Sequence, residues 1–257
     1  MTLRSAIENK EFIITCEVGP VKGTNIEEIE ESCEVLKGKV TAANITDQQS
    51  SAMRLGSLVT SHLAKERGID PIYQVTCRDR NRIALQSDLL SASVLGIENV
   101  LALTGDLPSL GDHPHAKPVF DLDSVGLLGA IETLNSGFDM AGNELNGKTN
   151  FFPGAVVNPG ADTEASYEMQ IRKMEKKIRA GAKFIQTQAI YDVDLFDRFM
   201  KRVAGFGVPV LAGVIPLKSV GMARYMNKSV AGVFVPEDLI QKLKNSEDKT
   251  AMGIQIA

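Results

Sequence analysis

A glycine followed by an apolar run recurs along this chain, and this pattern constrains the fold more than any other feature of the sequence. The four clearest copies, RGIDPIYQV, LGIENVLAL, AGAKFIQTQ and FGVPVLAGV, begin at Arg67, Leu95, Ala180 and Phe206. Glycine readily ends a helix, so each copy predicts a junction between a helix and the strand that follows it. The first two copies, like the last two, are spaced by close to one strand-helix unit of roughly 30 residues. The sequence therefore predicts a fold that repeats such units.

Seven apolar runs are predicted to be strands. They cover residues 12–17, 42–47, 72–77, 100–104, 154–158, 184–188 and 210–215. Between them, apolar residues at three- and four-residue spacing, such as Leu55, Leu58, Val59 and Leu63, predict helices with one apolar stripe. Strands that are apolar throughout and separated by helices indicate parallel pairing with both faces covered. Two α/β folds satisfy this pattern, the doubly wound sheet and the closed (β/α)8 barrel.

The polar residues at the strand ends favour the barrel. Six of them follow or end different strands: Glu17, Asp47, Arg78, Asp106, Asn158 and Gln188. In a TIM-type (β/α)8 barrel those ends meet at one mouth, where active sites lie. A doubly wound sheet would instead have a glycine-rich turn after its first strand, but CEVGPVKG lacks the pattern G-x-G-x-x-G. We therefore expect a TIM-type barrel.

The segment after the seventh predicted strand contains no further strand pattern. It reads as two or three helical segments with a turn near Val235 and Pro236. A barrel with an open gap would leave unpaired edges on its first and seventh strands. We therefore expect a single barrel domain over residues 1–257 that is C-terminally incomplete, with seven strand-helix units visible and the eighth strand missing.

The composition of the chain limits the classes of molecule that it is expected to bind. The formal charge of −4 and the pI of about 5.5 provide no extended basic field, which argues against nucleic acid and anionic membrane surfaces as partners. No apolar stretch approaches the roughly 18 residues of a membrane span, and the N-terminus lacks the apolar core of a secretory signal. We therefore expect a cytoplasmic protein that acts on a small molecule.

Glu17 is a candidate general acid. It ends the run FIITCEV, whose apolar residues would raise the pKa of its carboxyl group. The alternative is a strand-end glutamate that lies in water or pairs with Arg78 or Arg80.

Asp106 and Gln188 are the other two candidates at strand ends. Gly105 and Pro108 would present Asp106 from a constrained turn, although an aspartate there can simply cap the turn. The Gln188 amide can donate and accept at once, as recognition of a heterocycle edge requires, or it can cap the next helix. His113 and His115 have the spacing of a metal pair, but no second histidine cluster accompanies them, so we expect no metal site.

Five short motifs occur at the ends of successive predicted strands: TCEVGP, TCRDRN, LALTGD, VVNPGAD and FIQTQAIYD. With these motifs in this order, nearly the whole chain resembles the flavin-dependent methylenetetrahydrofolate reductases, particularly their short bacterial and archaeal form. The resemblance implies a (β/α)8 barrel and an oxidoreductase of one-carbon metabolism. It also implies that hydride passes from reduced flavin N5 to the methylene carbon of 5,10-methylenetetrahydrofolate, which becomes 5-methyltetrahydrofolate.

The resemblance also implies roles for individual residues. It places the catalytic glutamate at Glu17, the aspartate that faces flavin and pterin at Asp106, and the pterin-binding glutamine at Gln188; Val220 stands where an aromatic residue can cover the folate. The implied flavin contacts are Thr46, Gln74, Leu103, Thr104, Gly105, Asp106, Val156, Asn158, Asp162 and Lys177.

Several of these positions depart from the family pattern. Gln74 and Asp162 stand where histidine occurs in relatives, and Thr104 stands where many have arginine. The resemblance implies FAD as the cofactor. Because fewer cationic or hydrogen-bonding groups would face its diphosphate, FMN and weak, partner-dependent flavin binding stay open as alternatives. The implied electron donor is NAD(P)H or another reductant.

Two other functions stay open on the sequence. One is a non-catalytic or electron-transfer-complex subunit that keeps the reductase barrel, and the other is a flavin-free pterin-binding methyltransferase barrel. The sequence also leaves open whether the chain forms a homo-oligomer or binds an electron-donor subunit.

Overall fold

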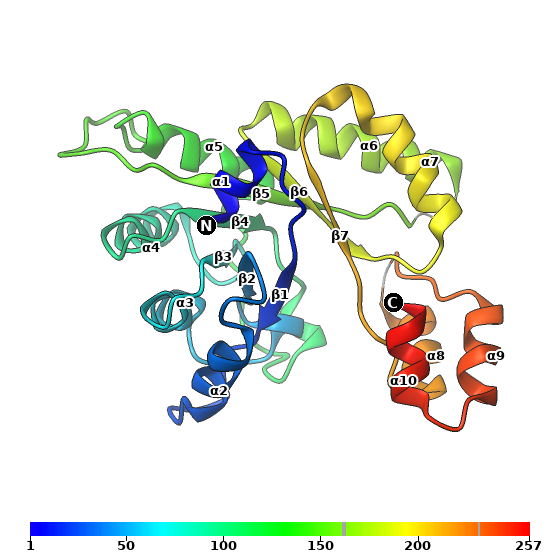
Figure 1. The fold of residues 1–257 in the computed structure, drawn as a ribbon. Coiled ribbons are helices and arrows are strands. Elements are labelled where there is room, and N and C mark those ends of the chain that lie inside the picture. Colours follow the sequence, from blue (N-terminus) through cyan, green and yellow to red (C-terminus); the bar gives the residue numbers. More distant parts are fainter. Residues whose placement is uncertain (161–162, 231) are drawn as a thin grey trace. The chain divides into compact units, whose positions relative to one another are not determined.

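Strands and helices alternate along the chain in the computed structural model (Figure 1), which describes residues 1–160, 163–230 and 232–257. The strands are β1 (Thr15–Val18), β2 (Ala42–Ile45), β3 (Pro71–Thr76), β4 (Asn99–Leu103), β5 (Phe152–Val157), β6 (Phe184–Ala189) and β7 (Val210–Gly213). All seven predicted strands are confirmed. The first and last are shorter than predicted because their outer apolar residues face solvent: Phe12 is 90% and Ile215 is 42% exposed.

Helices follow the strands as the apolar spacing predicts. They are α1 (Leu3–Glu8), α2 (Glu27–Leu36), α3 (Ser57–Glu66), α4 (Arg82–Val94), α5 (Ser124–Asn135), α6 (Glu164–Arg179), α7 (Val193–Val203), α8 (Val220–Ser229), α9 (Glu237–Asn245) and α10 (Lys249–Ile256). Gly68 and Gly96, just after α3 and α4, have φ of 84° and 70°, which is the left-handed conformation that ends helices. The predicted helix-to-strand junctions are therefore confirmed.

The strands follow one another in the sheet in chain order from β1 to β7. The chain divides into two compact units, Met1–Ala155 with Lys177–Lys183 and Val156–Lys176 with Phe184–Ala257. The assignment of one barrel domain to residues 1–257 stays a prediction.

The first unit contains parallel pairs from β1 to β5. Glu17 on β1 lies opposite Asn44 on β2, and Thr76 on β3 lies opposite Leu103 on β4. Helices α2 and α3 cover β1 and β2 through Ile29, Cys33 and Ala64, which are buried in one cluster with residues of both strands. Because these strands are parallel, their carboxyl ends share one edge of the sheet.

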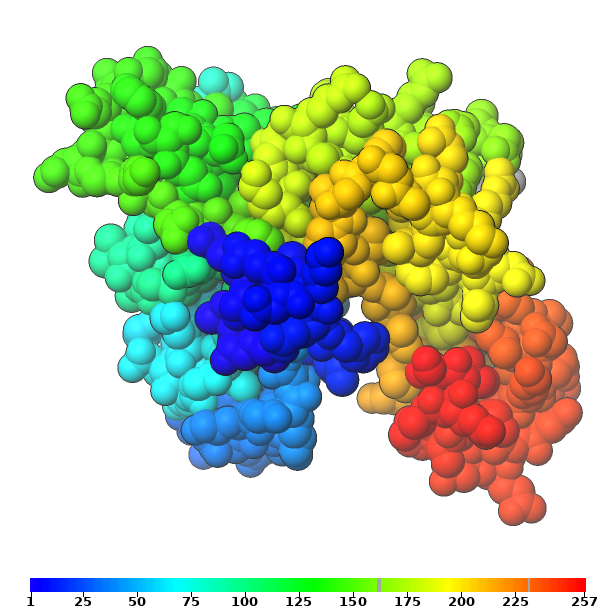
Figure 2. Space-filling model, turned by 45° about the horizontal axis from the view of Figure 1, so that its top comes forward, coloured from blue at the N-terminus to red at the C-terminus, as the bar shows by residue number. Residues whose placement is uncertain are grey.

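Helix α1 packs near the amino ends of the strands. The Leu3 backbone N–H donates to Asp70 Oδ2 at 2.7 Å, and Asn99 Nδ2 donates to the same oxygen at 3.0 Å. Arg4 binds Asn150 through its side-chain and backbone oxygens. Figure 2 shows this N-terminal segment, in dark blue, at the surface of the first unit.

The second unit contains the parallel pair β6 and β7 and the helices after them. Ion pairs between Arg198 and Glu164 and between Arg202 and Glu168 join α6 to α7. Helices α8 and α9 form a buried cluster that includes Met226, Ile240 and Leu243. The predicted helical segments after the seventh strand are confirmed as α8, α9 and α10.

None of the helices in the described ranges combines the length and the apolarity that crossing a bilayer requires.

Two helical glycines give opposite predictions for stability. A Cβ added to the buried Gly253 in α10 would lie 1.9 Å from the Leu217 carbonyl oxygen, so Gly253→Ala should separate the helix from that backbone and lower the free energy of unfolding by about 1–3 kcal/mol. Gly129 in α5 has open space around its Cβ position, so Gly129→Ala should raise it by about 1 kcal/mol. Urea denaturation checks both, and changes of the same sign would contradict the packing described here.

Candidate active site

The carboxyl edge of the first unit brings several of the candidate residues to one side of the sheet. Glu17 lies in β1, and Thr46 and Asp47 follow β2. Gln74 and Thr76 lie in β3, while Leu103 ends β4 and is followed by Thr104, Gly105 and Asp106. Since β1 to β4 are parallel and adjacent, these positions share one edge, as the barrel model predicts.

A buried ion pair joins the ends of β2 and β3. The Asp47 carboxylate accepts hydrogen bonds from the Thr76 N–H at 2.8 Å and hydroxyl at 2.9 Å, and from Arg80 Nη1 at 2.7 Å and Nη2 at 3.2 Å. Arg80 also pairs with Asp88 at 2.8 Å. Burial alone would lower the pKa of Arg80, but the hydrogen bonds and charge of Asp47 raise it. The charge on Asp47 is therefore fully paired at this edge.

Glu17 is free of this ion-pair system. The two cations that the sequence suggested as its partners bind elsewhere, Arg78 to Asp79 and Arg80 to Asp47. The Glu17 carboxylate instead accepts a hydrogen bond from Gln49 Nε2 at 3.2 Å. The residue is solvent-exposed, yet desolvation by the surrounding protein raises the pKa of its carboxyl group, and the Gln49 hydrogen bond opposes part of that rise. The direction agrees with the expectation for a general acid.

The Asp106 carboxylate has no partner among the described residues. The residue is exposed, and its carboxylate forms no hydrogen bond or ion pair with any residue that the structure describes. It therefore caps no backbone N–H in those ranges, unlike the turn-capping aspartate that was the alternative. Its backbone carbonyl accepts a hydrogen bond from the Ser51 hydroxyl at 3.2 Å.

Gly105 allows the backbone before Asp106 to pass close to β3. Its φ is 93°, and an added Cβ would meet the Cβ atoms of Thr76 and Arg78 at 3.1 Å. Thr104 is exposed, and its hydroxyl accepts a hydrogen bond from the Ser124 N–H at the start of α5. The turn after β4 is thus constrained on both sides.

One feature at this edge suits the polar rim of a flat heterocycle. The Thr46 hydroxyl is buried, with 3% of the residue exposed, and it has no hydrogen-bond partner within the described part of the chain. A flavin ring edge would use an unpaired buried hydroxyl of this kind, so Thr46 fits the cofactor that the sequence predicts. Gln74, by contrast, donates to Asn44 Oδ1 at 3.4 Å.

The remaining candidates have separate surroundings. Lys177 is half-buried in α6, and Val156 and Asn158 are half-buried at and just after the end of β5. A Cβ at Gly232 would overlap the Asn158 amide, so the two residues are in direct contact. Asp162 lies outside the described residues.

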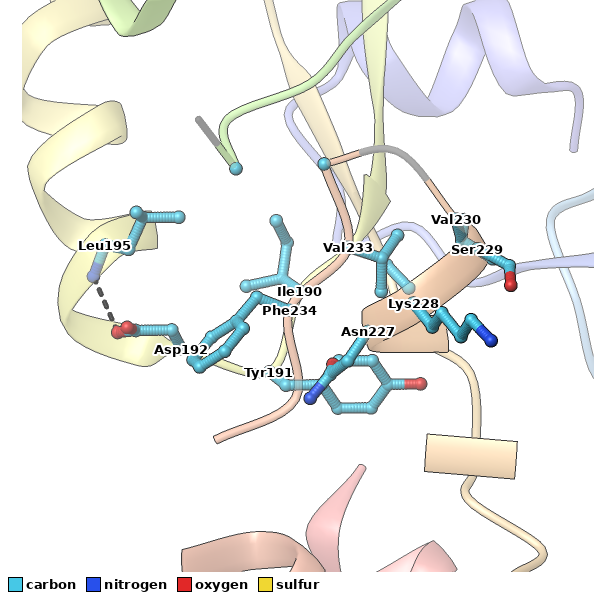
Figure 3. Close-up of a pocket in the computed structure, with 13 residues that line it drawn as sticks. Ile190, Tyr191, Asp192, Leu195, Asn227, Lys228, Ser229, Val230, Val233 and Phe234 are labelled. Carbon is cyan, nitrogen blue, oxygen red and sulfur yellow. Dashed lines mark hydrogen bonds between the residues drawn. The ribbon is translucent and has the colours of Figure 1, made fainter. Parts of the chain in front are cut away.

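Gln188 and Val220 belong to the second unit. Gln188 is exposed near the end of β6, and its amide forms no hydrogen bond with residues in the described ranges. It does not cap α7, because Asp192 Oδ1 accepts the Leu195 N–H at 2.9 Å (Figure 3). Val220 is half-buried at the start of α8 and packs against the cluster of α8 and α9.

A cavity of about 400 Å³ lies in the second unit, between the loop after β6 and the end of α8. Figure 3 shows Ile190, Tyr191, Leu195 and Phe234 around it. None of the described candidate residues lines this cavity. Two of its polar side chains already have partners: the Tyr191 hydroxyl donates to the Ile215 carbonyl, and the Asn227 amide exchanges hydrogen bonds with Val235.

Sequence reasoning missed Gln49 and Ser51, which contact Glu17 and Asp106. Both lie in the polar run DQQSS after β2. A polar run after a strand predicts only a loop, and nothing in it indicates which side chains reach the neighbouring strands.

Comparison with known proteins agrees with the motifs. A family model described as methylenetetrahydrofolate reductase matches residues 2–257. Methylenetetrahydrofolate reductase (NADH) 1 of Arabidopsis thaliana is 28% identical over 203 residues, which are 74% of this chain and 32% of that protein. A probable methylenetetrahydrofolate reductase (NADPH) of Caenorhabditis elegans is 24% identical over 180 residues, 69% of this chain and 25% of that protein.

A bacterial relative, 5,10-methylenetetrahydrofolate reductase of Salmonella typhimurium, is 28% identical over 164 residues, 62% of this chain and 49% of that protein. The chain thus spans between a quarter and a half of the length of these relatives.

A solved structure supports the fold. An uncharacterized protein from Clostridium thermocellum that binds two copies of 5-methyl-5,6,7,8-tetrahydrofolic acid superposes with a TM-score of 0.71 at 18% identity, covering 99% of this chain and 83% of that chain. With the strand order, this likeness confirms the predicted α/β fold of the TIM-barrel type. Because the family model covers the chain from residue 2 to residue 257, the chain belongs to the methylenetetrahydrofolate reductase family.

Proposed function

We propose that this chain reduces 5,10-methylenetetrahydrofolate to 5-methyltetrahydrofolate with a bound flavin at the carboxyl edge of its strands. One observation carries the proposal. Glu17 and Asp106, the two carboxylates that the family motifs mark as functional, lack cationic partners among the described residues, although Arg78 and Arg80 lie on the same edge. Folate as the substrate is also supported by family membership and by the folate that the Clostridium protein binds.

The cofactor in this proposal is FAD, with FMN as the alternative. When bound, a flavin would supply a hydride to the methylene carbon of the substrate. Its ring would be held by the Thr46 hydroxyl, by Gln74 and by the turn of Leu103, Thr104 and Gly105. The family resemblance also implies flavin contacts at Val156, Asn158 and Asp162 and a phosphate contact at Lys177.

Glu17 acts as the proton donor in the proposed reaction. The five-membered ring of the substrate must open, and its amine nitrogen N10 needs a proton as it leaves. A carboxyl group with a raised pKa keeps its proton to a higher pH than an ordinary glutamate does, which suits a proton donor. The position of Glu17 on β1 makes it part of the rigid sheet rather than of a mobile loop.

The family resemblance implies substrate-binding roles for Asp106 and for Gln188, which the proposal adopts for each residue by itself. The unpaired Asp106 carboxylate would stabilise the positive charge that forms on the substrate when its ring opens. The Gln188 amide, which is exposed and unpaired within the described residues, would recognise the pterin edge, and Val220 would cover the folate.

Anaerobic spectroscopy tests the function as a whole. The purified chain should be yellow, its flavin absorbance should bleach with one of NADH, NADPH or reduced ferredoxin, and methylenetetrahydrofolate should restore it. The same experiment identifies the electron donor, for which the relatives give no single answer because they are named for different nucleotides. Reduced flavin that the folate leaves bleached would contradict the proposal. Folate binding by a colourless protein would favour the methyltransferase alternative, and a colourless protein that binds no folate would favour the non-catalytic subunit.

Glu17→Gln should separate the two halves of the reaction. Glutamine keeps the size of the side chain but cannot donate a carboxyl proton, so flavin reduction by the donor should stay nearly intact while folate reduction falls by about 10²-fold or more. Stopped-flow absorbance measures each half-reaction alone. Unchanged folate reduction would remove Glu17 from the mechanism.

Gln49→Ala should change the pH dependence of folate reduction. The Gln49 hydrogen bond favours the ionised form of Glu17, so its loss should raise the pKa of Glu17 further. The acid form then persists to higher pH, and the alkaline fall in rate should move to higher pH. Gln241→Ala, which removes a glutamine bound to Glu237, is the control and should leave the profile unchanged. A fall that moves to lower pH, or does not move, would contradict the role of this hydrogen bond.

A further inference from the structure

The loop between β2 and α3 has an unusual backbone. Gln48, Ser50 and Ser51 have φ values of 48°, 56° and 56°, although none of them is glycine. A non-glycine residue in the left-handed region costs of order 1 kcal/mol or more, so it persists only where surrounding contacts require it. The contacts of Ser51 identify what requires it here.

Ser51 joins this loop to the backbone of Asp106. Its hydroxyl lies 3.2 Å from the carbonyl oxygen of Asp106 and 3.0 Å from that of Leu107, so the two carbonyls share its proton. The same oxygen accepts a hydrogen bond from Arg78 Nη1 at 2.9 Å. Ser51 and Arg78 are only 8% and 3% exposed, so water does not compete freely for these bonds.

The segment around Asp106 lies directly on this loop. A Cβ added to Gly111 would lie 1.9 Å from the Ser51 carbonyl oxygen, and one added to Gly105 would lie 3.1 Å from the Cβ atoms of Thr76 and Arg78. Two glycines with close neighbours therefore bracket Asp106, one before it and one after it. Its carboxylate has no hydrogen bond of its own with the residues described, so only the backbone can direct it.

We propose that Ser51 is a positioning residue, whose hydroxyl, held by Arg78, fixes the backbone of Asp106 and so aims the Asp106 carboxylate at the substrate. The inference rests on the proposed function through the role of Asp106. Ser51 itself touches no reacting atom. Its effect on the ligand passes through Asp106, because small displacements of a binding group weaken its interactions strongly.

A double-mutant cycle tests this inference on the full chain with flavin bound, with 5-methyltetrahydrofolate as the probe. The dissociation constant is measured for the wild type, Ser51→Ala, Asp106→Asn and the double variant. Ser51→Ala should raise it by about tenfold in the wild-type background and by less than about twofold in the Asp106→Asn background, where no carboxylate is left to aim. A purely structural role would weaken binding equally in both backgrounds.

Two control variants separate the hydroxyl from the backbone strain. Ser51→Gly also removes the hydroxyl but tolerates φ of 56°, so it should weaken binding as Ser51→Ala does, and it carries the test if the alanine variant does not fold. Wild-type affinity in Ser51→Gly would overturn the inference. Ser50→Ala changes an exposed neighbour with the same φ, and it should bind as the wild type does. An equal loss in Ser50→Ala would also overturn the inference.

The cycle distinguishes failure of the inference from failure of the proposed function. If Asp106→Asn leaves the dissociation constant unchanged, the proposed role of Asp106 is wrong and the inference falls with it. If Asp106→Asn weakens binding but Ser51→Ala does not, or does so equally in both backgrounds, only the inference is wrong.

Discussion

The buried carboxylate of Asp47 is the interaction on which the candidate site depends. It accepts hydrogen bonds from the backbone N–H and the hydroxyl of Thr76 and from two nitrogens of Arg80, and its side chain is fully buried. A buried charge with all its partners in place resists displacement, because removing one partner leaves an uncompensated ion. Asp47 follows Thr46 and precedes the loop of Gln49 and Ser51. The ion pair between Asp47 and Arg80 therefore fixes the start of this loop. From there Gln49 contacts Glu17, and Ser51 contacts Asp106.

The surroundings of these two carboxylates differ in the way that a reaction with both an acid and an anion requires. Desolvation raises the pKa of Glu17, and a hydrogen bond from Gln49 opposes this rise. Asp106 is exposed and is placed by its backbone rather than by contacts of its own carboxylate. Neither carboxylate pairs with the nearby cations, because Arg78 binds Asp79 and Arg80 binds Asp47.

Much of the fold could be predicted from the sequence, because a parallel α/β fold leaves a simple local signal. A glycine such as Gly68 or Gly96 ends a helix, and an apolar run follows that is buried on both faces. Strand ends were less predictable: Phe12 is apolar yet 90% exposed. The places of Glu17 and Asp106 at strand ends followed from the same pattern. The contacts of Ser51 did not, since they depend on a left-handed backbone that its sequence neighbours do not indicate and on Arg78, which comes from another strand end.

The central claim is that this edge of the first unit is where flavin and folate meet. A crystal structure of the chain grown with flavin and 5-methyltetrahydrofolate tests it most directly. The account predicts ligand density against Thr46, Gly105 and Asp106, with the pterin near the Asp106 carboxylate. Ligand density confined to the cavity around Ile190, Tyr191 and Phe234, with none at Asp106, would contradict it.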